Sequence, residues 1–391
     1  MTADQAPPDK RRPPERLTHL SVSGFRSIRW LDLELGDLTV LVGANGAGKS
    51  NFVAFFHLLS SILSERLQQY VLARGGASSV LHYGPKLMGF IRAKLAFSGE
   101  KGTSSYRFSL GFAEPDRLVF WEEVLEFHPE SGPGPFNRVI NSGAVETNLK
   151  RYAAFDGEPE LQAAARVFLK RLQDLRVYHF HDTSETAAIR LTQDIGDNRV
   201  LGRNGENLAA FLYMLQQSYP AHYDRILATV RLAVPYLQDL VLEPDPPNRT
   251  RIRLRWRDRS SDHEFGAHQL SDGSLRAIAL ITALLQPEEL LPALIAIDEP
   301  ELGLHPSAVQ TVATLIQSVA SKRQVVVATQ SSRLIAAFAP EDVVVVERFE
   351  DESGRGESTF ERLSRERLGD WVNDYDLGQL YDMNVTGGGP R

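Results

Sequence analysis

Eight consecutive residues have the types and spacing of a phosphate-binding loop. Residues 43–50 read GANGAGKS and fit the pattern GxxxxGK[ST], between a predicted buried strand and a predicted helix. Glycines let successive backbone N–H groups turn toward phosphates, and the helix N-terminus adds the positive end of its dipole. A glycine-rich turn with a surface lysine is the alternative, and it leaves eight matching positions unexplained. The predicted nucleotide-contacting residues are Gly43, Ala44, Asn45, Gly46, Ala47, Gly48, Lys49, Ser50 and Asn51.

Two roles follow from the chemistry of this loop. Lys49 would reach the β- and γ-phosphates of a nucleoside triphosphate, and the Ser50 hydroxyl would join the ligand shell of Mg²⁺. The run LIAIDE at 294–299 would supply the matching carboxylates, because α/β sheets place ligands at the carboxyl ends of their strands. We expect Asp298 to bind Mg²⁺ with Ser50, and Glu299 to act as the general base that polarises the attacking water.

The sequence LSDGS at 270–274 precedes a predicted helix and offers a third anion site. Ser271 and Gly273 are its candidate ligands. Taken alone, the same five residues favour an ordinary helix N-cap, with Ser271 or Asp272 as the capping side chain.

Composition sets the frame in which these motifs must be positioned. The chain has 391 residues, 42% hydrophobic and 24% charged, with no cysteine and a formal net charge of -7. The absence of cysteine excludes disulfides, thiolate metal sites and cysteine nucleophiles. Because the net charge is negative, nucleic acid could bind only at a local basic patch. No apolar run approaches a membrane span, and the charged, proline-rich start is unlike a secretory signal. We therefore expect a cytoplasmic protein without membrane contact.

Hydrophobic periodicity predicts a sheet core built from both ends of the chain. Residues 1–16 should be a disordered tail, 17–83 the first part of the core, 84–264 a mixed strand and helix insertion, and 265–391 the second part. Within these ranges we expect a helix over 49–69, antiparallel strands over 84–130, a long loop over 131–157 and mainly helix over 161–233. One strand is expected over 250–259, and the final GGGPR should be frayed.

The order of these motifs resembles ABC-type ATPase heads of the RecF/SMC-like group, including the stand-alone ATPases related to RecF and to the ATPase half of OLD-family proteins. The phosphate loop, the insertion, LSDGS, ALIAIDEPE, LGLHP and VVVATQS follow one another as in that group, and SVSGFRSIRWLDLEL resembles its opening. The resemblance is specific over 17–83 and 265–347. It implies an α/β P-loop NTPase fold: an ABC-type ATPase head with a mixed β/helical insertion.

The resemblance also implies a mechanism and partners. LSDGS would stand for the ABC signature, so that Ser271 and Gly273 contact the ATP held by a second copy in a homodimer. Residues 301–305 would be the D-loop crossing the dimer seam, and Arg26 would lie near the nucleotide. The implied setting is DNA repair or defence against foreign DNA. The alternative is an ATPase that regulates a separate effector or toxin protein without binding DNA, since no fused nuclease is expected after the last core strand.

Two positions depart from the family pattern. The residue after VVVAT is usually histidine, and here it is Gln330, whose amide can hydrogen-bond a phosphate or a water but carries no charge. We expect a working and slower switch at this position, with an ordinary surface glutamine as the alternative. No glutamine stands clearly in the Q-loop context.

Two further patterns have both functional and structural interpretations. Arg251, Arg253, Arg255 and Arg257 alternate with apolar residues, so one strand face could hold DNA phosphates, or could simply be a charged edge that discourages strand pairing. His179 and His181 share a predicted strand face beside Asp182. Without a third ligand nearby, hydrogen-bonded histidines are favoured over a metal site there.

Overall fold

The computed structural model describes residues 15–131, 134–154, 158–246, 248–351 and 353–389. The tail predicted over 1–16 lies almost entirely outside these ranges. Its last residue, Arg16, already belongs to the first strand, where it forms an ion pair with Asp37.

A six-stranded core sheet contains the strands that precede the predicted site residues, and its strand order is β17-β16-β3-β15-β14-β8. Its strands are β3 (Leu38–Val42), β8 (Leu175–Tyr178), β14 (Leu294–Asp298), β15 (Gln324–Thr329), β16 (Val343–Glu350) and β17 (Gly356–Arg362). All neighbours are parallel except β16 and β17. The carboxyl ends of β8, β14, β15 and β3 therefore meet at one edge of the sheet.

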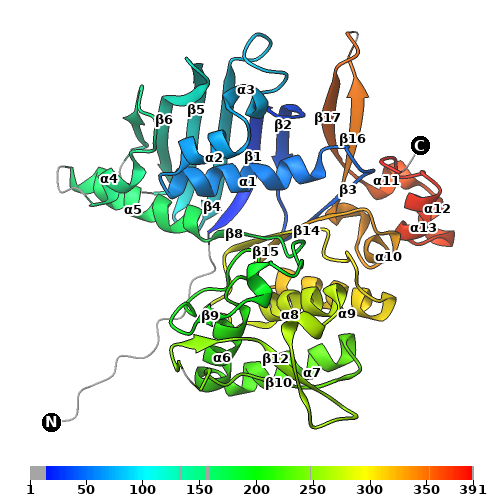
Figure 1. Ribbon diagram of the computed structural model, residues 1–391. Helices are drawn as coiled ribbons and strands as arrows, with labels where there is room; N and C mark the ends of the chain where they lie inside the picture. The colour runs from blue at the N-terminus through cyan, green and yellow to red at the C-terminus, as the bar shows by residue number, and fades with distance from the viewer. Residues whose placement is uncertain (1–14, 132–133, 155–157, 247, 352, 390–391) are drawn as a thin grey trace.

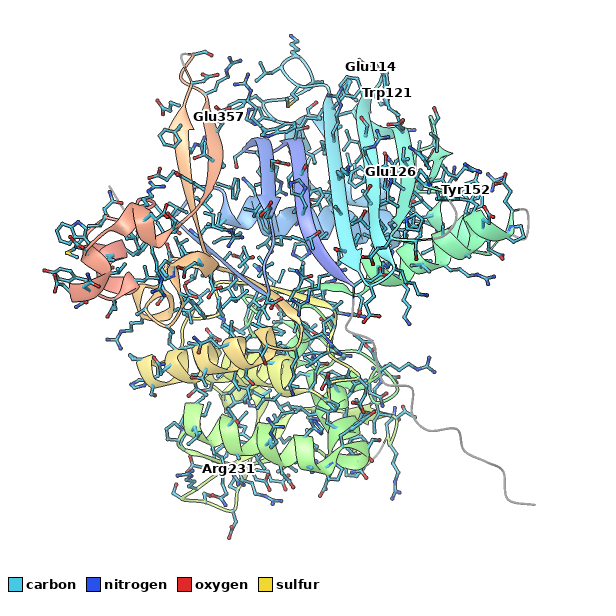
Figure 2. All side chains as sticks on the ribbon, turned by 180° about the vertical axis from the view of Figure 1, so that it is seen from behind. Glu114, Trp121, Glu126, Tyr152, Arg231 and Glu357 are labelled. Atoms are coloured by element: carbon cyan, nitrogen blue, oxygen red, sulfur yellow. The ribbon has the colours of Figure 1, made fainter. Side chains whose placement is uncertain are left out.

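A second six-stranded sheet is antiparallel, in the order β2-β1-β4-β5-β6-β7. Its strands are β1 (Arg16–Phe25), β2 (Ile28–Glu34), β4 (Phe90–Gly99), β5 (Gly102–Ala113), β6 (Arg117–Pro129) and β7 (Phe136–Asn141). Strand β1 pairs with β4 along its length, so the strands at 16–34 and those at 90–129 form one sheet. In the view from behind, Trp121 and Glu126 lie along β6 of this sheet (Figure 2).

Helix α1 (Lys49–Leu63) lies between the two sheets (Figure 1). Alternate residues of the core strands face opposite sides: Leu41 packs toward α1 and the antiparallel sheet, whereas Val40 and Val42 pack toward helices on the other side. Both faces of the core sheet are thus covered, which explains why its strands are continuous apolar runs.

The opposite side carries α6 (Leu208–Ser218), α7 (Pro220–Ala233), α8 (Asp272–Leu285) and α9 (Pro306–Ala320). Shorter strands near them are β9 (Gln193–Asp194), β10 (Leu237–Val241), β11 (Arg251–Ile252), β12 (Arg255–Asp258) and β13 (Glu264–Gly266). The remaining helices are α2 (Leu67–Ala73), α3 (Ala77–Val80), α4 (Leu149–Ala154), α5 (Pro159–Gln173), α10 (Ser332–Ile335), α11 (Arg365–Leu368), α12 (Trp371–Asp374) and α13 (Leu377–Asp382). No helix in the described ranges combines the length and apolar character needed to cross a bilayer.

Three local expectations were wrong. The helix expected over 49–69 ends at Leu63, where Glu65 takes a left-handed conformation with φ 57°, and a separate helix starts at Leu67. The loop expected over 131–157 contains β7, which adds an edge to the antiparallel sheet, and α4. The GGGPR end is not frayed over its described part, because Gly388 and Gly389 are buried and donate hydrogen bonds to Glu347 and Asn384.

The strand expected over 250–259 is divided. Arg251 belongs to β11, which pairs with β9, and Arg255 and Arg257 belong to β12, which pairs with β10 and β13. The four arginines therefore do not form one strand face. Arg253 pairs with Asp245 at 3.0 Å, and Arg255 and Arg257 share Glu264 at 2.6 and 2.7 Å. Carboxylates thus offset much of the expected positive charge.

Candidate nucleotide site

The loop at 43–50 joins β3 to α1 in a shape that depends on its glycines. Gly46 and Gly48 have φ of 81° and 122°, a region that residues with a side chain rarely adopt. A Cβ on Gly43 would lie 2.3 Å from the Val346 carbonyl oxygen, and one on Gly48 would lie 2.1 Å from Ser358 Oγ. Residues of strands β16 and β17 therefore lie in close contact with this loop and leave no room for side chains at Gly43 and Gly48.

Lys49 points back into this loop. Its Nζ donates hydrogen bonds to the carbonyl oxygens of Gly43 at 2.5 Å and Ala44 at 3.0 Å. Burial lowers the pKa of Lys49, while the carboxylates of Glu299, Asp298 and Glu301 oppose that change. A buried ammonium facing three carboxylates across a glycine-rich loop suits a polyanionic ligand, which would replace the carbonyl oxygens as its partner.

A polar chain holds the start of α1 against the turn at 24–27. Arg26 Nη1 donates to Asn51 Oδ1 at 3.2 Å, and Asn51 Nδ2 donates to Ser27 Oγ at 2.6 Å. Ser358 Oγ donates to the Ala47 carbonyl oxygen at 2.6 Å and also meets Ser27. Arg26 and Asn51, both predicted as nucleotide contacts, thus lie together beside the loop. Ser27 and Ser358 had no sequence signal, since the contact joins segments more than 300 residues apart.

Asp298 ends β14 with its side chain only 5% exposed. Burial raises its pKa, with Glu299 adding to the rise, while His181, the Ser50 hydroxyl and Lys49 act in the opposite direction. Its Oδ1 is inaccessible to solvent and has no hydrogen-bond partner among the described residues. A buried, unpartnered carboxylate oxygen beside a serine hydroxyl fits a hard divalent cation such as Mg²⁺, which takes oxygen ligands. Ser50 and Asp298 are therefore the residues that would hold it.

Glu299 follows with φ 45°, a left-handed conformation that costs about 1 kcal/mol or more for a residue with a Cβ. Its backbone N–H donates to the Ala328 carbonyl oxygen at 2.8 Å, which fixes this turn to β15. His181 Nε2 lies 3.9 Å from Glu299 Oε2 and 3.1 Å from the Asp298 carbonyl oxygen. The Glu299 side chain is 21% exposed at the carboxyl end of β14.

Glu301 is a further buried carboxylate at this edge. Its Oε1 accepts a hydrogen bond from Thr329 Oγ1 at 2.6 Å and one from the Gln330 backbone N–H at 3.3 Å. Burial raises the pKa of Glu301, and these hydrogen bonds lower it. The Gln330 side chain itself is exposed. Glu301 thus connects the loop after β14 with the loop after β15.

Residues 271–274 form the N-terminus of α8. Ser271 Oγ caps the helix by accepting a hydrogen bond from the Ser274 N–H at 3.2 Å. The prediction that Ser271 is a helix N-cap is therefore confirmed. Arg190 pairs with Asp272 at 2.7 Å. Within the described residues, no hydrogen bond connects 271–274 with 43–50 of the same chain. The two predicted phosphate sites are thus not joined by hydrogen bonds within the described part of one copy.

The histidine pair is nearer the carboxylates than the sequence indicated. Strand β8 ends at Tyr178, so His179 and His181 lie just beyond it, with ring centroids 3.9 Å apart. Burial lowers the pKa of His179 to about 4, with His181 contributing. Across the described part of the chain, no three His, Asp or Glu side chains converge on one ion position. The contact with Asp298 was not foreseen, because it depends on β8 pairing with β14.

The chain matches known proteins at three levels. A family model described as AAA domain, putative AbiEii toxin, Type IV TA system, matches residues 38–336. The DNA replication and repair protein RecF of Paenarthrobacter aurescens (strain TC1) is 40% identical over 89 residues, which are 22% of this chain and only 20% of that protein's length.

Two solved structures share the fold. An SmcHead bound to the C-winged helix domain of ScpA matches with a TM-score of 0.59 at 16% identity, over 90% of this chain and 99% of that one. The Smc head domain with an extended coiled coil, bound to the C-terminal domain of ScpA derived from Pyrococcus furiosus, gives 0.58 at 14% identity, over 92% and 99%.

Proposed function

The chain belongs to the AAA domain family described as putative AbiEii toxin, Type IV TA system, within the RecF/SMC-like ABC-type ATPases, and we propose that it binds and hydrolyses ATP with Mg²⁺. One observation carries this proposal: the buried ammonium of Lys49 lies within the glycine-rich loop, where Nζ donates hydrogen bonds to the carbonyl oxygens of Gly43 and Ala44. Loop, lysine and carboxylates are the parts that phosphoryl transfer requires, since positioning and electrostatics supply most of the catalysis.

Each residue has a distinct part in the proposed reaction. Gly43–Ser50 would hold the phosphates through backbone N–H groups, and Lys49 would offset the charge on the β- and γ-phosphates. Mg²⁺ held by Ser50 and Asp298 would neutralise charge on the phosphate oxygens. Glu299 would accept a proton from the attacking water. Gln330 would hydrogen-bond the γ-phosphate or that water through its side-chain amide, which stays neutral throughout.

We infer that two copies close around two ATP molecules. Ser271 and Gly273 lie at the exposed N-terminus of α8, which has 14 residues and a positive dipole end suited to an anion. Beside it, Leu302 of the 301–305 loop is 38% exposed. Both features are accounted for if a second copy supplies the γ-phosphate to α8 and covers the loop.

The proposed setting is DNA repair or defence against foreign DNA, supported by the segment similar to RecF. A second candidate is control of a separate effector protein without DNA binding. The family description, which names a toxin of a toxin–antitoxin system, and the ion pairs around the arginines at 251–257 favour it. The structurally similar Smc heads bind a partner protein, ScpA.

Phosphate release from ATP by the purified chain, with and without Mg²⁺, tests the ATPase proposal. Turnover that needs Mg²⁺ and is lost in Lys49→Ala supports it, and the absence of ATP binding by the parent chain rejects it. Isolation of the Glu299→Gln variant with ATP then separates the two settings: co-isolated nucleic acid supports the first, and one stoichiometric protein partner supports the second.

A further inference from the structure

Two buried polar atoms at the ends of the neighbouring strands β8 and β14 lack hydrogen-bond partners among the described residues. Asp298 Oδ1 and His179 Nδ1 are both inaccessible to solvent and make no hydrogen bond with the described residues. His179 Nδ1 lies 3.9 Å from the other carboxylate oxygen of Asp298, Oδ2, which is too long for a hydrogen bond. Buried polar groups are nearly always satisfied, so this pair requires an explanation.

The two histidines of this segment have different surroundings. His181 Nε2 is 3.1 Å from the Asp298 carbonyl oxygen, an acceptor, so this nitrogen must donate its proton there. His179 has no such neighbour at Nδ1. The pairing of β8 with β14 sets this difference, because it brings the first residue after β8 level with Asp298 at the end of β14.

We propose that His179 is a nitrogen ligand of the nucleotide-bound divalent cation, together with Asp298 and Ser50, so that the site accepts Mn²⁺ in preference to Mg²⁺. This inference rests on the proposed function. Adjacent donors of one octahedral cation, each about 2.1 Å from it, lie about 3 Å apart, so the 3.9 Å between Nδ1 and Oδ2 would shorten by about 1 Å when the cation binds. Mg²⁺ takes oxygen ligands, whereas first-row transition ions also accept imidazole.

The protein offers a matched control. His57 on α1 is partly buried, as His179 is, and its ring packs edge-on against His179 with centroids 6.4 Å apart. It makes no described contact with Asp298. His57→Gln therefore reproduces the loss of a partly buried histidine near His179 while leaving the proposed nitrogen ligand in place.

Pulsed electron paramagnetic resonance of Mn²⁺ is the direct test. The chain carrying ¹⁵N-labelled histidine is saturated with Mn²⁺ and a non-hydrolysable ATP analogue, and the spectrum is examined for ¹⁵N coupling to the metal. We expect coupling in the parent and in His57→Gln, and none in His179→Gln. An Mn²⁺-loaded parent without ¹⁵N coupling overturns the inference and assigns His179 to packing alone.

Competition between the two metals gives a second measurement. Titration of the Mn²⁺–analogue complex with Mg²⁺ yields the ratio of the two affinities. His179→Gln exchanges nitrogen for an amide oxygen, so the preference for Mn²⁺ should fall at least ~10-fold. An unchanged ratio contradicts the inference. If the parent binds no analogue with either metal, the proposed function fails and this inference with it, whereas binding without coupling rejects the inference alone.

Discussion

Gly273 at the start of α8 lies directly against Gly303 of the loop after β14. A Cβ on Gly273 would be 2.0 Å from the Gly303 carbonyl oxygen, and Gly303 itself has φ 73°. Arg276 donates to the carbonyl oxygens of Leu302, Phe180 and His181, and so fixes the same loop to the segment after β8. A change in the carboxylate turn at 298–299 can therefore reach the exposed end of α8 through direct contacts.

The first prediction concerns closure of the dimer. With ATP, the Glu299→Gln variant should sediment as a dimer. Adding Ser271→Asp should keep it monomeric, because aspartate still caps α8 but repels the phosphate of the second copy. Ser271→Asn caps equally well without charge and should leave the dimer intact. A monomer at micromolar concentration in the Glu299→Gln variant itself would reject the two-copy arrangement.

Lys49→Ala should abolish nucleotide binding, because the buried ammonium would be the main cationic partner of the phosphates. Binding of a fluorescent ATP analogue measures this loss. The exposed Lys322→Ala is the control and should bind as the parent does. Retained affinity in this variant would contradict the assigned role.

Glu299→Gln should bind ATP but release phosphate at least ~100-fold more slowly, as expected when a general base is lost. The amide keeps the size of the side chain, and the turn at φ 45° is set by backbone contacts with β15. Single-turnover phosphate release is the measurement, with the exposed Glu288→Gln as control. Parental turnover in Glu299→Gln would transfer the assignment to another residue at this edge, with Glu301 the next to test.

If the arginines at 251–257 hold DNA, removing two positive charges there should weaken binding to all sequences alike. The double change Arg251→Gln and Arg253→Gln should lower the slope of log affinity against log salt by about 0.9 per lost contact. Arg365→Gln with Arg367→Gln removes the same charge from ion pairs near the C-terminus and should change nothing. If the slope of log affinity against log salt were the same in both double variants, these arginines would not contact DNA, and the partner-protein alternative would be favoured.

The His57 ring predicts a pH dependence of stability. Burial lowers the pKa of His57 to about 4 in the folded chain, below the usual 6.5. Between pH 4 and pH 6.5 the unfolded chain binds more protons than the folded chain does. The contribution of His57 to the free energy of unfolding is therefore complete above pH 6.5 and decreases as the pH falls toward 4. Denaturant unfolding at several pH values should show a shallower decrease for His57→Gln. Parallel curves for the two proteins would show that the ring is not protected from protonation.

The sequence could predict the parts of the site that depend on local order. Residues 43–50 combine a strand, a tight turn and a helix start, and 294–299 end a buried strand, so each is recognisable within a short window. The fold class follows from the same motifs, and the structural neighbours confirm it.

Contacts between distant segments could not be predicted in this way. Ser358 beneath the phosphate loop, His179 beside Asp298 and Glu301 beneath Thr329 all depend on which strands become neighbours. The arginine pattern misled for a related reason. The alternation at 251–257 correctly indicated that its apolar residues are buried. The backbone nevertheless passes from one small sheet to another between Ile252 and Arg255, so the arginines do not share one face.

The pairing of Leu38 with Val325 has a consequence for how the chain is made. Strand β3 finds its neighbours β15 and β16 only after almost 300 further residues have left the ribosome. At roughly 5 to 20 residues per second, this takes between about 15 and 60 s. During that interval the valines and leucines of β3 have no sheet to join, and loop closure over such a separation is slow. The apolar strand β3 therefore stays unpaired during synthesis, and slower translation without chaperones should increase aggregation of the nascent chain.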